Sequence, residues 1–553
     1  MHIDEHAALN ADCPGWPEAD RDRYRAAGYW GDETFAGTLA RLAARHGAKT
    51  ALIEGEIQLS YAELGRRAEM LAGAFAALGL VRGDRAVVQL PNGVAFVETV
   101  LALTRLGVVP VLALPSHRRL EIGRFCAFTR AKLFVTADRL NGFDHRALAR
   151  EVRAEAPDLI HVVIDGAAEE FTPLDSLRTW SGPVPPDAAA AGDVAVFQIS
   201  GGTTGVPKLI PRRHDEYLYN IATAARASGM DGGTVYLCAL PVAHNFPFAC
   251  PGVMGTLVSG GTAVLAPDPG PETGFALIER HRVTITSLVP PLALLWMQAA
   301  PESERDRSSL RTLQVGGAKL ASEAARRVRP ALGCRLQQVF GMAEGLICYT
   351  GLDDDDETVA LTQGRPMSPG DEVRVVDEAG NDVPPGEPGQ LLTRGPYTIR
   401  GYYRIPEHNE VAFTPDGFYR TGDIVRVMED GSLILSGRDK DQINRGGEKL
   451  SPEEVENLLL AHEGVHDAAV VGLPDPELGE RICAFVILRD AGLKPLALTR
   501  HLRSKGIAAY KIPDQFLFLD RFPETGVGKV SRKVLREMLK QAYQAEPATG
   551  TEG

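Results

Sequence analysis

Residues 200–208 combine side chains that can hold phosphate, in the order Ser200-Gly-Gly-Thr-Thr-Gly-Val-Pro-Lys208. Glycine lets the backbone turn several N–H groups toward one point, while the hydroxyls and Lys208 add donors and a positive charge. The segment is not a Walker A loop, because Val206 and Pro207 separate the last glycine from the lysine. An ordinary Gly/Thr turn is the alternative interpretation, and the loop alone does not decide between them.

Two carboxylates stand close to predicted strand ends further along the chain. Glu344 follows the apolar run 336–340, where a carboxylate is suited to hold Mg²⁺ on the phosphates of a nucleotide. Asp423 ends the motif Tyr419-Arg-Thr-Gly-Asp423 and is expected at the start of a strand, where it can accept hydrogen bonds from both ribose hydroxyls. Taken singly, a surface glutamate and a capping aspartate are the ordinary interpretations.

Two more glycine-rich segments have a shape or charge of interest. Val315-Gly-Gly-Ala318 ends a predicted strand without a bulky side chain at three positions, as a flat purine lying on the backbone requires, although a plain turn fits equally well. Thr525-Gly-Val-Gly-Lys529 places a lysine in a glycine-rich loop near the C-terminus. Considered alone, Lys529 is a solvated lysine.

The composition is that of an ordinary globular protein, with 44% hydrophobic and 24% charged residues. A chain of 553 residues is too long for one core, so at least two domains are expected. The net charge of −13 argues against nucleic acid or an anionic membrane as the main partner. The seven cysteines show no CxxC spacing, which suits a reducing cytoplasm and offers no zinc site.

No targeting or membrane segment is predicted, so we expect a cytoplasmic protein. The first residues lack the basic and apolar regions of a secretory signal. The most apolar window, 94–115, is interrupted by Glu98 and Arg105 and is therefore interpreted as buried core.

Helical and strand patterns alternate from about residue 34 to 190 and again from about 215 to 345, which predicts βαβ units and a parallel sheet covered on both faces. Residues 1–30 are polar and are expected to lie on the surface. Helices are predicted at 35–46 and 61–78. Strands are predicted at 85–90, 108–113, 132–136, 160–164, 194–199, 234–238, 262–265, 285–288, 312–315 and 336–340.

The texture changes after Gly364 to short strands and Gly/Pro turns. Asp430-Gly431 between two apolar runs predicts a hairpin. Ser451-Pro-Glu-Glu454 is interpreted as a capping box that opens a helix through His462. Strands near 468–471, 482–488 and 516–519 and a helix near 496–504 complete a small α+β domain, and residues 544–553 are expected to be a loose tail.

Taken together and in this order, the motifs resemble the adenylate-forming superfamily of acyl-CoA synthetases, luciferases and peptide-synthetase adenylation domains. Besides the phosphate loop, they are Gly341-Met-Ala-Glu344, Tyr419-Arg-Thr-Gly-Asp423, Gly437-Arg-Asp-Lys-Asp441 and Gly528-Lys529. The resemblance covers about residues 30–540. Within the superfamily, Pro241-Val-Ala-His-Asn-Phe-Pro247 and Ile199-Ser-Gly-Gly-Thr-Thr204 are most similar to the stand-alone aryl-acid–AMP ligases of siderophore biosynthesis.

The resemblance implies an α/β fold in two parts, of which the small C-terminal one is mobile. A large N-terminal adenylation core, 1–437, would hold layered βαβ sheets and a small distorted β-barrel. A hinge at 438–441 would connect it to a mobile α+β lid, 442–543, that carries Lys529. Lys440 stands at the hinge position, where the family more often has an acid.

The resemblance also implies a site for ATP and Mg²⁺. Lys529 would bridge the α-phosphate and the attacking carboxylate, and Glu344 would hold Mg²⁺; with His244 they are the expected catalytic residues. The β- and γ-phosphates would bind Ser200, Gly201, Gly202, Thr203, Thr204 and Lys208. The adenine would lie against Gly317, Ala318, Val339, Phe340 and Gly341. The ribose would bind Asp423 and Arg438, and a pantetheine thiol would enter beside Gly446, Gly447 and Lys449.

The acid pocket implied by the resemblance is the most individual part. His244 and Asn245 would flank the carboxylate and an ortho-hydroxyl, with walls from Phe246, Gly316, Gly341 and Ile347. The family places Ser at Cys250 and Val at Ile347 in 2,3-dihydroxybenzoate enzymes, whereas Cys with a larger aliphatic wall is typical of salicylate enzymes. Serine offers a real hydrogen bond to a 3-hydroxyl, while cysteine is a weak donor. Alternatively, Cys250 is only a packed core thiol.

The implied activity has two half-reactions: an aryl acid, most simply salicylate, is activated to aryl-AMP with release of pyrophosphate and is then transferred to the phosphopantetheine thiol of an aryl carrier protein. Activation of 2,3-dihydroxybenzoate and use of free coenzyme A as acceptor are the near alternatives. A non-catalytic nucleotide-binding protein of this fold is an alternative of another class. It is disfavoured because Lys529, Glu344 and Asp423 are all present.

Overall fold

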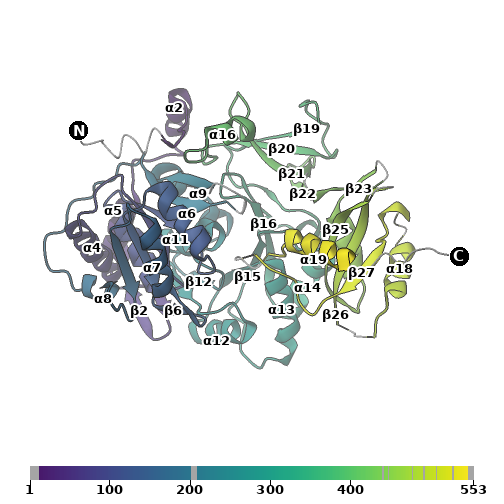
Figure 1. Ribbon diagram of the computed structural model, residues 1–553, viewed down its shortest axis with the longest axis horizontal. Helices are drawn as coiled ribbons and strands as arrows, with labels where there is room; N and C mark the ends of the chain where they lie inside the picture. The colour runs from purple at the N-terminus through teal and green to yellow at the C-terminus, as the bar shows by residue number, and fades with distance from the viewer. Residues whose placement is uncertain are drawn as a thin grey trace.

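The computed structural model describes residues 12–200, 208–438, 441–445, 448–475, 478–489, 492–505, 507, 509–525 and 529–545. Over these ranges the chain forms sheets of nine, seven, four and five strands and a two-stranded hairpin, β6 (Arg139–Leu140) with β7 (Phe143–Asp144). Figure 1 shows a large α/β body with the C-terminal elements, in yellow, packed at one end near β15 and β16. No helix within the described ranges is long and apolar enough to cross a membrane.

The nine-stranded sheet has a parallel centre. Its central strands are short apolar runs, as expected of strands that are covered on both faces. Because β15 and β16 are parallel neighbours, the turns that follow them lie at the same edge of the sheet. In spatial order the strands are β18 (Arg365–Pro366), β17 (Ile347–Tyr349), β16 (Arg335–Gly341), β15 (Thr312–Gly316), β14 (Ile285–Leu288), β12 (Val235–Cys238), β13 (Thr262–Leu265), β1 (Thr50–Glu54) and β2 (Ile57–Ser60).

The seven-stranded sheet is parallel except at the edge that carries the phosphate-loop motif. There β10 and β11 pair antiparallel, so Ile199 and Leu209, at the two ends of the motif, lie opposite each other. In spatial order the strands are β11 (Leu209–Arg213), β10 (Val194–Ile199), β4 (Val109–Leu112), β3 (Arg85–Gln89), β5 (Leu133–Ala137), β8 (His161–Asp165) and β9 (Thr172–Pro173).

A shared layer of helices lies between these two sheets. Alternate residues of a strand point to opposite faces, and Tyr236 and Cys238 pack into this layer while Leu237 packs on the far side. The central layer contains α3 (Phe35–His46), α4 (Tyr61–Ala77), α5 (Val94–Arg105), α9 (His214–Ala227) and α11 (Gly252–Val258). The far face of the nine-stranded sheet is covered by α12 (Pro271–His281), α13 (Pro290–Ala299) and α14 (Ser322–Leu332), and that of the seven-stranded sheet by α6 (Arg119–Thr129) and α7 (His145–Glu155).

An antiparallel four-stranded sheet follows the large body. The predicted hairpin is confirmed, because β21 and β22 flank Asp430-Gly431, and Gly431 has a φ of +81° that favours glycine. The resemblance implied a small distorted β-barrel, and the described strands at this place form an open sheet. Its order is β19 (Glu372–Val376), β20 (Gly389–Arg394), β21 (Tyr419–Val427) and β22 (Leu433–Arg438).

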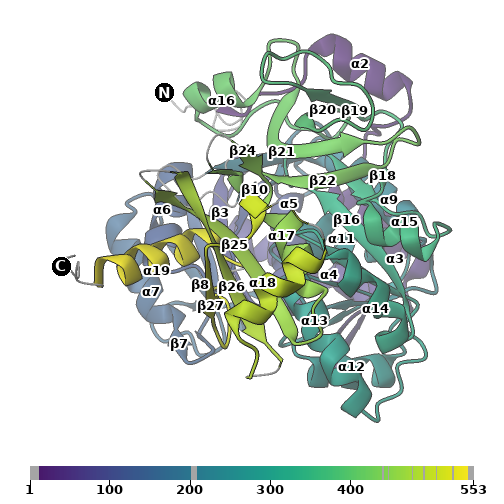
Figure 2. The same cartoon turned by 90° about the vertical axis from the view of Figure 1, so that its right-hand side faces the viewer.

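The C-terminal unit is a sheet covered on both faces, as Figure 2 shows. Helices α17 (Pro452–Leu460) and α18 (Pro495–Ser504) pack on one face and α19 (Arg532–Ala545) on the other. The predicted capping box is wrong: the Ser451 hydroxyl donates to Glu453 at 2.6 Å instead of accepting from the helix backbone. The strands are β24 (Glu448–Leu450), β23 (Ile443–Arg445), β26 (Gly479–Leu488), β25 (Val465–Asp475) and β27 (Gln515–Phe518).

The N-terminal segment is anchored more firmly than its polar sequence predicted. Helix α2 (Glu18–Ala26) places Tyr24 against Trp16 and Trp30, and all three side chains are buried. The Trp30 indole N–H donates to the carbonyl of Pro396 at 2.8 Å.

At the C-terminal end, α19 continues two residues into the predicted tail. The remaining short helices are α8 (Leu174–Leu177), α10 (Asn245–Ala249), α15 (Asp356–Leu361) and α16 (Pro406–Ala412).

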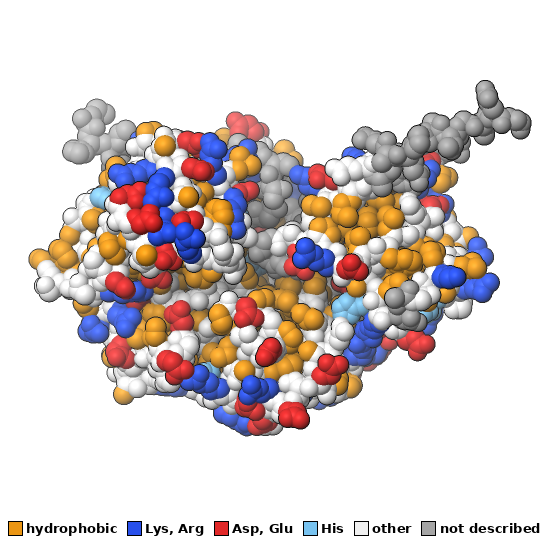
Figure 3. Space-filling model, turned by 60° about the horizontal axis from the view of Figure 1, so that its bottom comes forward, with side chains coloured by type: hydrophobic (Ala, Val, Ile, Leu, Met, Phe, Trp, Pro, Cys, Tyr) orange, Lys and Arg blue, Asp and Glu red, His pale blue; other side chains and the backbone are white. Residues whose placement is uncertain are grey.

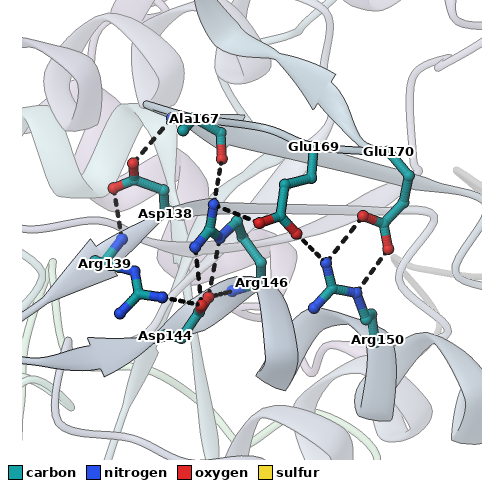
Figure 4. Close-up of polar contacts among 8 residues, drawn as sticks. All are labelled: Asp138, Arg139, Asp144, Arg146, Arg150, Ala167, Glu169 and Glu170. Carbon is teal, nitrogen blue, oxygen red and sulfur yellow. Dashed lines mark hydrogen bonds and ion pairs between the residues drawn. The ribbon is translucent and has the colours of Figure 1, made fainter.

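Charged side chains of both signs are interspersed on the face drawn in Figure 3. One cluster joins the β6–β7 hairpin, α7 and the turn after β8 (Figure 4). Arg146 pairs with Asp144 and Glu169, each at 2.8 Å, and Arg150 pairs with Glu170 at 2.6 Å and with Glu169. Arg150 and both glutamates are about half exposed, so this network lies in water.

Candidate active site

His244 immediately precedes the short helix α10 and caps it. Its Nδ1 accepts a hydrogen bond from the backbone N–H of Phe246 at 3.2 Å. Burial, followed by the charge of Lys529, lowers the pKa of His244 to about 3. The ring is therefore neutral at physiological pH, and because Nδ1 is an acceptor the proton resides on Nε2. His244 can donate one hydrogen bond from Nε2.

Lys529 reaches the same pocket from the C-terminal unit. The pocket is lined by Leu240, Pro241, His244, Phe246, Val289, Gly317 and Lys529. A Cβ added at Gly317 would lie 2.7 Å from Cε of Lys529, and Gly317 has a φ of +84°, so both space and backbone favour glycine here. The structure thus brings a flexible positive charge against His244.

The residues predicted to line the adenine separate into two kinds. Gly317, Ala318 and Gly341 expose backbone at the ends of β15 and β16, whereas Val339 and Phe340 are buried. Val339 packs in the apolar cluster with Phe246, and Phe340 packs toward the four-stranded sheet. A purine at this edge therefore meets mainly backbone.

Three of the acid-pocket candidates share one buried cluster. Phe246, Cys250 and Ile347 belong to it, and Cys250 is 3% exposed. A Cβ at Gly316 would lie 3.0 Å from the Phe246 ring, so the absence of a side chain there leaves room for the ring. Burial raises the pKa of Cys250 to about 12, which keeps the thiol neutral. The wall is apolar and uncharged.

Asn245 is the polar member of this region. Its Nδ2 donates to Sγ of Cys250 at 3.1 Å, and its Oδ1 accepts from the hydroxyl of Tyr217 at 2.5 Å. Asn245 is 6% exposed. Two of its polar atoms are therefore engaged within the protein, which the sequence did not predict.

The phosphate end is described in part. The backbone N–H of Ser200 donates to the carbonyl of Lys208 at 3.1 Å, which extends the β10–β11 pairing by one step. The Lys208 ammonium lies 6.0 Å from the centre of the Tyr402 ring. Gly201, Gly202, Thr203 and Thr204 lie outside the described residues.

Glu344, on the turn after β16, contacts the same tyrosine. It is 6% exposed, and Oε1 accepts a hydrogen bond from the hydroxyl of Tyr402 at 2.8 Å. Within the described part of the chain, its other carboxylate oxygen accepts no hydrogen bond. A hard cation prefers such an oxygen, and Mg²⁺ is commonly bound by one or two carboxylates together with substrate phosphates.

Asp423 and Arg438 are neighbours across β21 and β22, where their Cα atoms are paired in register. The prediction that Asp423 begins a strand is wrong, because β21 begins at Tyr419 and places Asp423 at its middle. The Gly422 before it has a φ of +73° within the strand, a conformation that favours glycine. Outside the described residues lie Lys440, Gly446 and Gly447, together with the side chains of Arg438 and Lys449.

A buried ion pair behind the pocket was missed by the sequence analysis. Arg212 of β11 and Glu216 of α9 are both fully buried and meet at 2.8 Å. The same guanidinium donates to the carbonyl of Ala343 at 2.8 Å, which holds the turn that carries Glu344. An arginine inside an apolar strand, with a glutamate four residues later, was the available signal.

Comparison with known proteins agrees with the motifs. The AMP-binding enzyme family matches residues 39–403, and the AMP-binding enzyme C-terminal domain matches residues 454–529. The chain is 56% identical to pyochelin synthase PchD of Pseudomonas aeruginosa strain UCBPP-PA14 over 97% of each chain. It is 54% identical to the 2,3-dihydroxybenzoate-AMP ligase of Bacillus subtilis strain 168, over 96% of this chain and 98% of that one.

Two mycobacterial proteins are also similar. The chain is 47% identical to the salicyl-AMP ligase / salicyl-S-ArCP synthetase of Mycobacterium tuberculosis, over 93% of this chain and 92% of that one. The apo structure of Mycobacterium smegmatis MbtA superposes with a TM-score of 0.76 and 46% identity, over 96% and 99% of the two chains. The predicted fold class and family are confirmed: this chain belongs to the AMP-binding, adenylate-forming enzymes.

Proposed function

We propose that this enzyme activates salicylate with ATP to salicyl-AMP and then transfers the salicyl group to the phosphopantetheine thiol of an aryl carrier protein in siderophore assembly. The observation that carries the choice of acid is the buried apolar wall of Phe246, Cys250 and Ile347. An acid with a second hydroxyl on that side would place it against a neutral thiol, which is a weak hydrogen-bonding group.

The relatives support the reaction class, since their names describe AMP ligases of salicylate and of 2,3-dihydroxybenzoate. They also define the alternative substrate, because the dihydroxybenzoate ligase is among the more similar proteins. Free coenzyme A is the alternative acceptor, and it presents the same pantetheine arm. The seven cysteines are free and buried, which fits the proposed cytoplasmic location.

In the first half-reaction, a carboxylate oxygen of the acid attacks the α-phosphorus of ATP in line, and the bond to pyrophosphate breaks. The Nε2–H of His244 is positioned to donate to one carboxylate oxygen and hold the acid in the attacking orientation. Lys529, in the same pocket, neutralises charge that develops between the carboxylate and the α-phosphate. Their apolar neighbours, Leu240, Val289 and Phe246, limit water.

The proposed magnesium site fits the residues present. Glu344 would hold Mg²⁺ through the oxygen that Tyr402 leaves free, and a bound Mg²⁺ would neutralise charge on the ATP phosphates. Ser200 and Lys208 are proposed to contact the β- and γ-phosphates beside it. Asp423 and Arg438 are proposed to bind the ribose.

For the second half-reaction we propose that the C-terminal unit swings about residues 438–441. This motion would withdraw Lys529 and admit the thiol beside Gly446, Gly447 and Lys449. The support for alternation is that Lys529 occupies the pocket in this structure. A thiol and the lysine therefore require different arrangements of the C-terminal unit.

The test is pyrophosphate exchange over substituted benzoates, followed by competition between coenzyme A and a holo-aryl carrier protein. The proposal predicts that salicylate gives the fastest exchange and that the carrier protein receives the salicyl group. Fastest exchange with 2,3-dihydroxybenzoate would assign the alternative substrate. Preferential formation of salicyl-CoA would assign the alternative acceptor.

A further inference from the structure

A buried chain of hydrogen bonds ends at Cys250, one of the residues predicted to line the acid pocket. Gln198 of β10 donates from Nε2 to the Tyr217 hydroxyl at 3.1 Å, Tyr217 donates to Oδ1 of Asn245 at 2.5 Å, and Asn245 donates from Nδ2 to Sγ of Cys250 at 3.1 Å. These side chains are 0–6% exposed. At such burial an unpaired polar atom is costly, so each hydrogen bond constrains the next.

The chain has a direction because a phenol has only one proton. The Tyr217 hydroxyl accepts from Gln198 and therefore gives its own proton to Asn245. With Gln198 as the donor, exchanging O and N in the Asn245 amide would point an N–H at that phenol and leave the phenol proton without its acceptor. Tyr217 itself is held rigidly, with the guanidinium of Arg212 lying 4.1 Å from its ring centre.

This direction leaves one unused donor on Asn245. An amide nitrogen carries two hydrogens, and among the described residues only Sγ of Cys250 accepts from Nδ2. Cys250 belongs to the wall that Phe246 and Ile347 complete. The second N–H of Asn245, whose neighbour His244 lines the pocket, thus has no acceptor among the described residues, while the amide oxygen is occupied by Tyr217.

We propose that Tyr217 is a specificity-determining positioning residue: it fixes Asn245 as a hydrogen-bond donor, so that the pocket selects acids with an acceptor oxygen at the ortho position. This inference rests on the proposed function. In salicylate the ortho-hydroxyl donates internally to the carboxylate, and its oxygen remains free to accept. In anthranilate one amino hydrogen does the same, but the other is a donor that opposes the Asn245 N–H.

The wild-type test measures kcat/KM for pyrophosphate exchange with salicylate, benzoate and anthranilate. A site that hydrogen-bonds a substrate group discriminates strongly against analogues lacking it. We expect salicylate to exceed benzoate by about 10²-fold or more and anthranilate to be no better than benzoate, since benzoate leaves the N–H unpaired whereas anthranilate opposes it. Anthranilate activity close to that of salicylate would overturn the inference.

The variant test is Tyr217→Phe, which removes the phenol proton and frees the amide to reverse. The salicylate-to-anthranilate ratio should fall by about tenfold, as for one orienting hydrogen bond of about 1.4 kcal/mol. Tyr61→Phe is the matched control: Tyr61 is equally buried and its hydroxyl bonds the carbonyls of Leu257 and Gly261, away from Asn245. Its ratio should remain that of the wild type.

The possible outcomes distinguish failure of the role of Tyr217 from failure of the proposed function. An active Tyr217→Phe enzyme with the wild-type ratio would overturn the role of Tyr217 and leave salicylate activation intact. An equal fall of the ratio in Tyr61→Phe would make the effect one of general destabilisation and would also overturn it. If the wild type does not activate salicylate, the proposed function fails and this inference fails with it.

Discussion

The two sides of the active site are held in place in different ways. On the acid side, Tyr217, Asn245 and Cys250 are buried in the large body, and each contacts the next through a hydrogen bond. On the other side, Lys529 enters from the C-terminal unit, and its backbone pairs with Thr525 four residues earlier. One side is a rigid wall and the other is a single flexible side chain.

Under the proposed function, this difference separates recognition of the acid, in the large body, from the chemistry that Lys529 supplies. A pocket built from buried, mutually bonded groups can discriminate between similar acids, because each ligand must replace a defined interaction. A lysine carried by a separate unit supplies charge when it is present and can leave afterwards. A change to the buried wall should therefore leave the contribution of Lys529 unchanged, and a change to Lys529 should leave the preference among acids unchanged.

The largest effect is expected for the ion pair behind the pocket. Glu216→Gln leaves the Arg212 charge buried and unpaired, since both side chains are 0% exposed. Loss of one partner of a buried pair costs about 3–5 kcal/mol in the free energy of unfolding. Urea unfolding of the variant should show this loss, whereas the double variant Arg212→Met/Glu216→Leu should regain much of it. Equal stabilities for wild type and Glu216→Gln would contradict the rigid-wall description.

Lys529→Ala should affect chemistry without affecting recognition. Loss of one preorganised charge-stabilising group lowers adenylation by about 10²–10³-fold, measured by pyrophosphate exchange. Transfer from supplied salicyl-AMP to the carrier protein should survive, and the preference among acids should not change. Lys533→Ala, an exposed lysine on α19, is the control and should behave as wild type. If both half-reactions fell together, Lys529 would not be confined to adenylation.

Cys250→Ser should change which acid is preferred without impairing the adenylation chemistry. The serine hydroxyl can hydrogen-bond a 3-hydroxyl, and an apolar site rejects an added hydroxyl only weakly, by about 10² or less. Activity on 2,3-dihydroxybenzoate should therefore rise by about tenfold while salicylate activity changes little. Cys348→Ser makes the same change in a buried thiol of a different cluster and is the control. A substrate ratio that does not move would remove Cys250 as a determinant.

The smallest effect is expected at the surface network of Figure 4. Arg150 has two ion pairs, but it is 43% exposed and its partners are about half exposed. Exposed pairs contribute about 0–1 kcal/mol, so Arg150→Ala should lower the free energy of unfolding by less than about 1 kcal/mol and leave exchange unchanged. If Arg150→Ala lowered the free energy of unfolding as much as Glu216→Gln, burial would not determine how much an ion pair contributes to stability.

Much of the fold could be predicted because local pattern and tertiary environment agree. The helix at 35–46 and the strands at 194–199 and 262–265 have the predicted bounds, since apolar periodicity there matches a buried face. The capping box at Ser451 was wrong because the same side chains can bond one another without bonding the backbone. The buried aromatic cluster of Trp16, Tyr24 and Trp30 was hidden by the polar residues between its members.

Motifs predicted those site residues that the family resemblance itself marks. Lys529 and His244 share a pocket although 285 positions separate them, and a resemblance could bring them together where periodicity could not. Tyr217 could not be found in this way. Its role depends on the direction of a hydrogen bond from Gln198, which is a property of three-dimensional arrangement.

The most direct test of the central claim is an internal competition. Wild-type enzyme, ATP and equal concentrations of salicylate, 2,3-dihydroxybenzoate and benzoate are mixed, and the aryl-AMP products are separated and quantified at low conversion, so that their ratio gives the ratio of kcat/KM. We expect salicyl-AMP to dominate, the dihydroxybenzoyl adenylate to be second and benzoyl-AMP to be least. A product mixture dominated by the dihydroxybenzoyl adenylate would contradict the assignment of the Cys250 and Ile347 wall to salicylate.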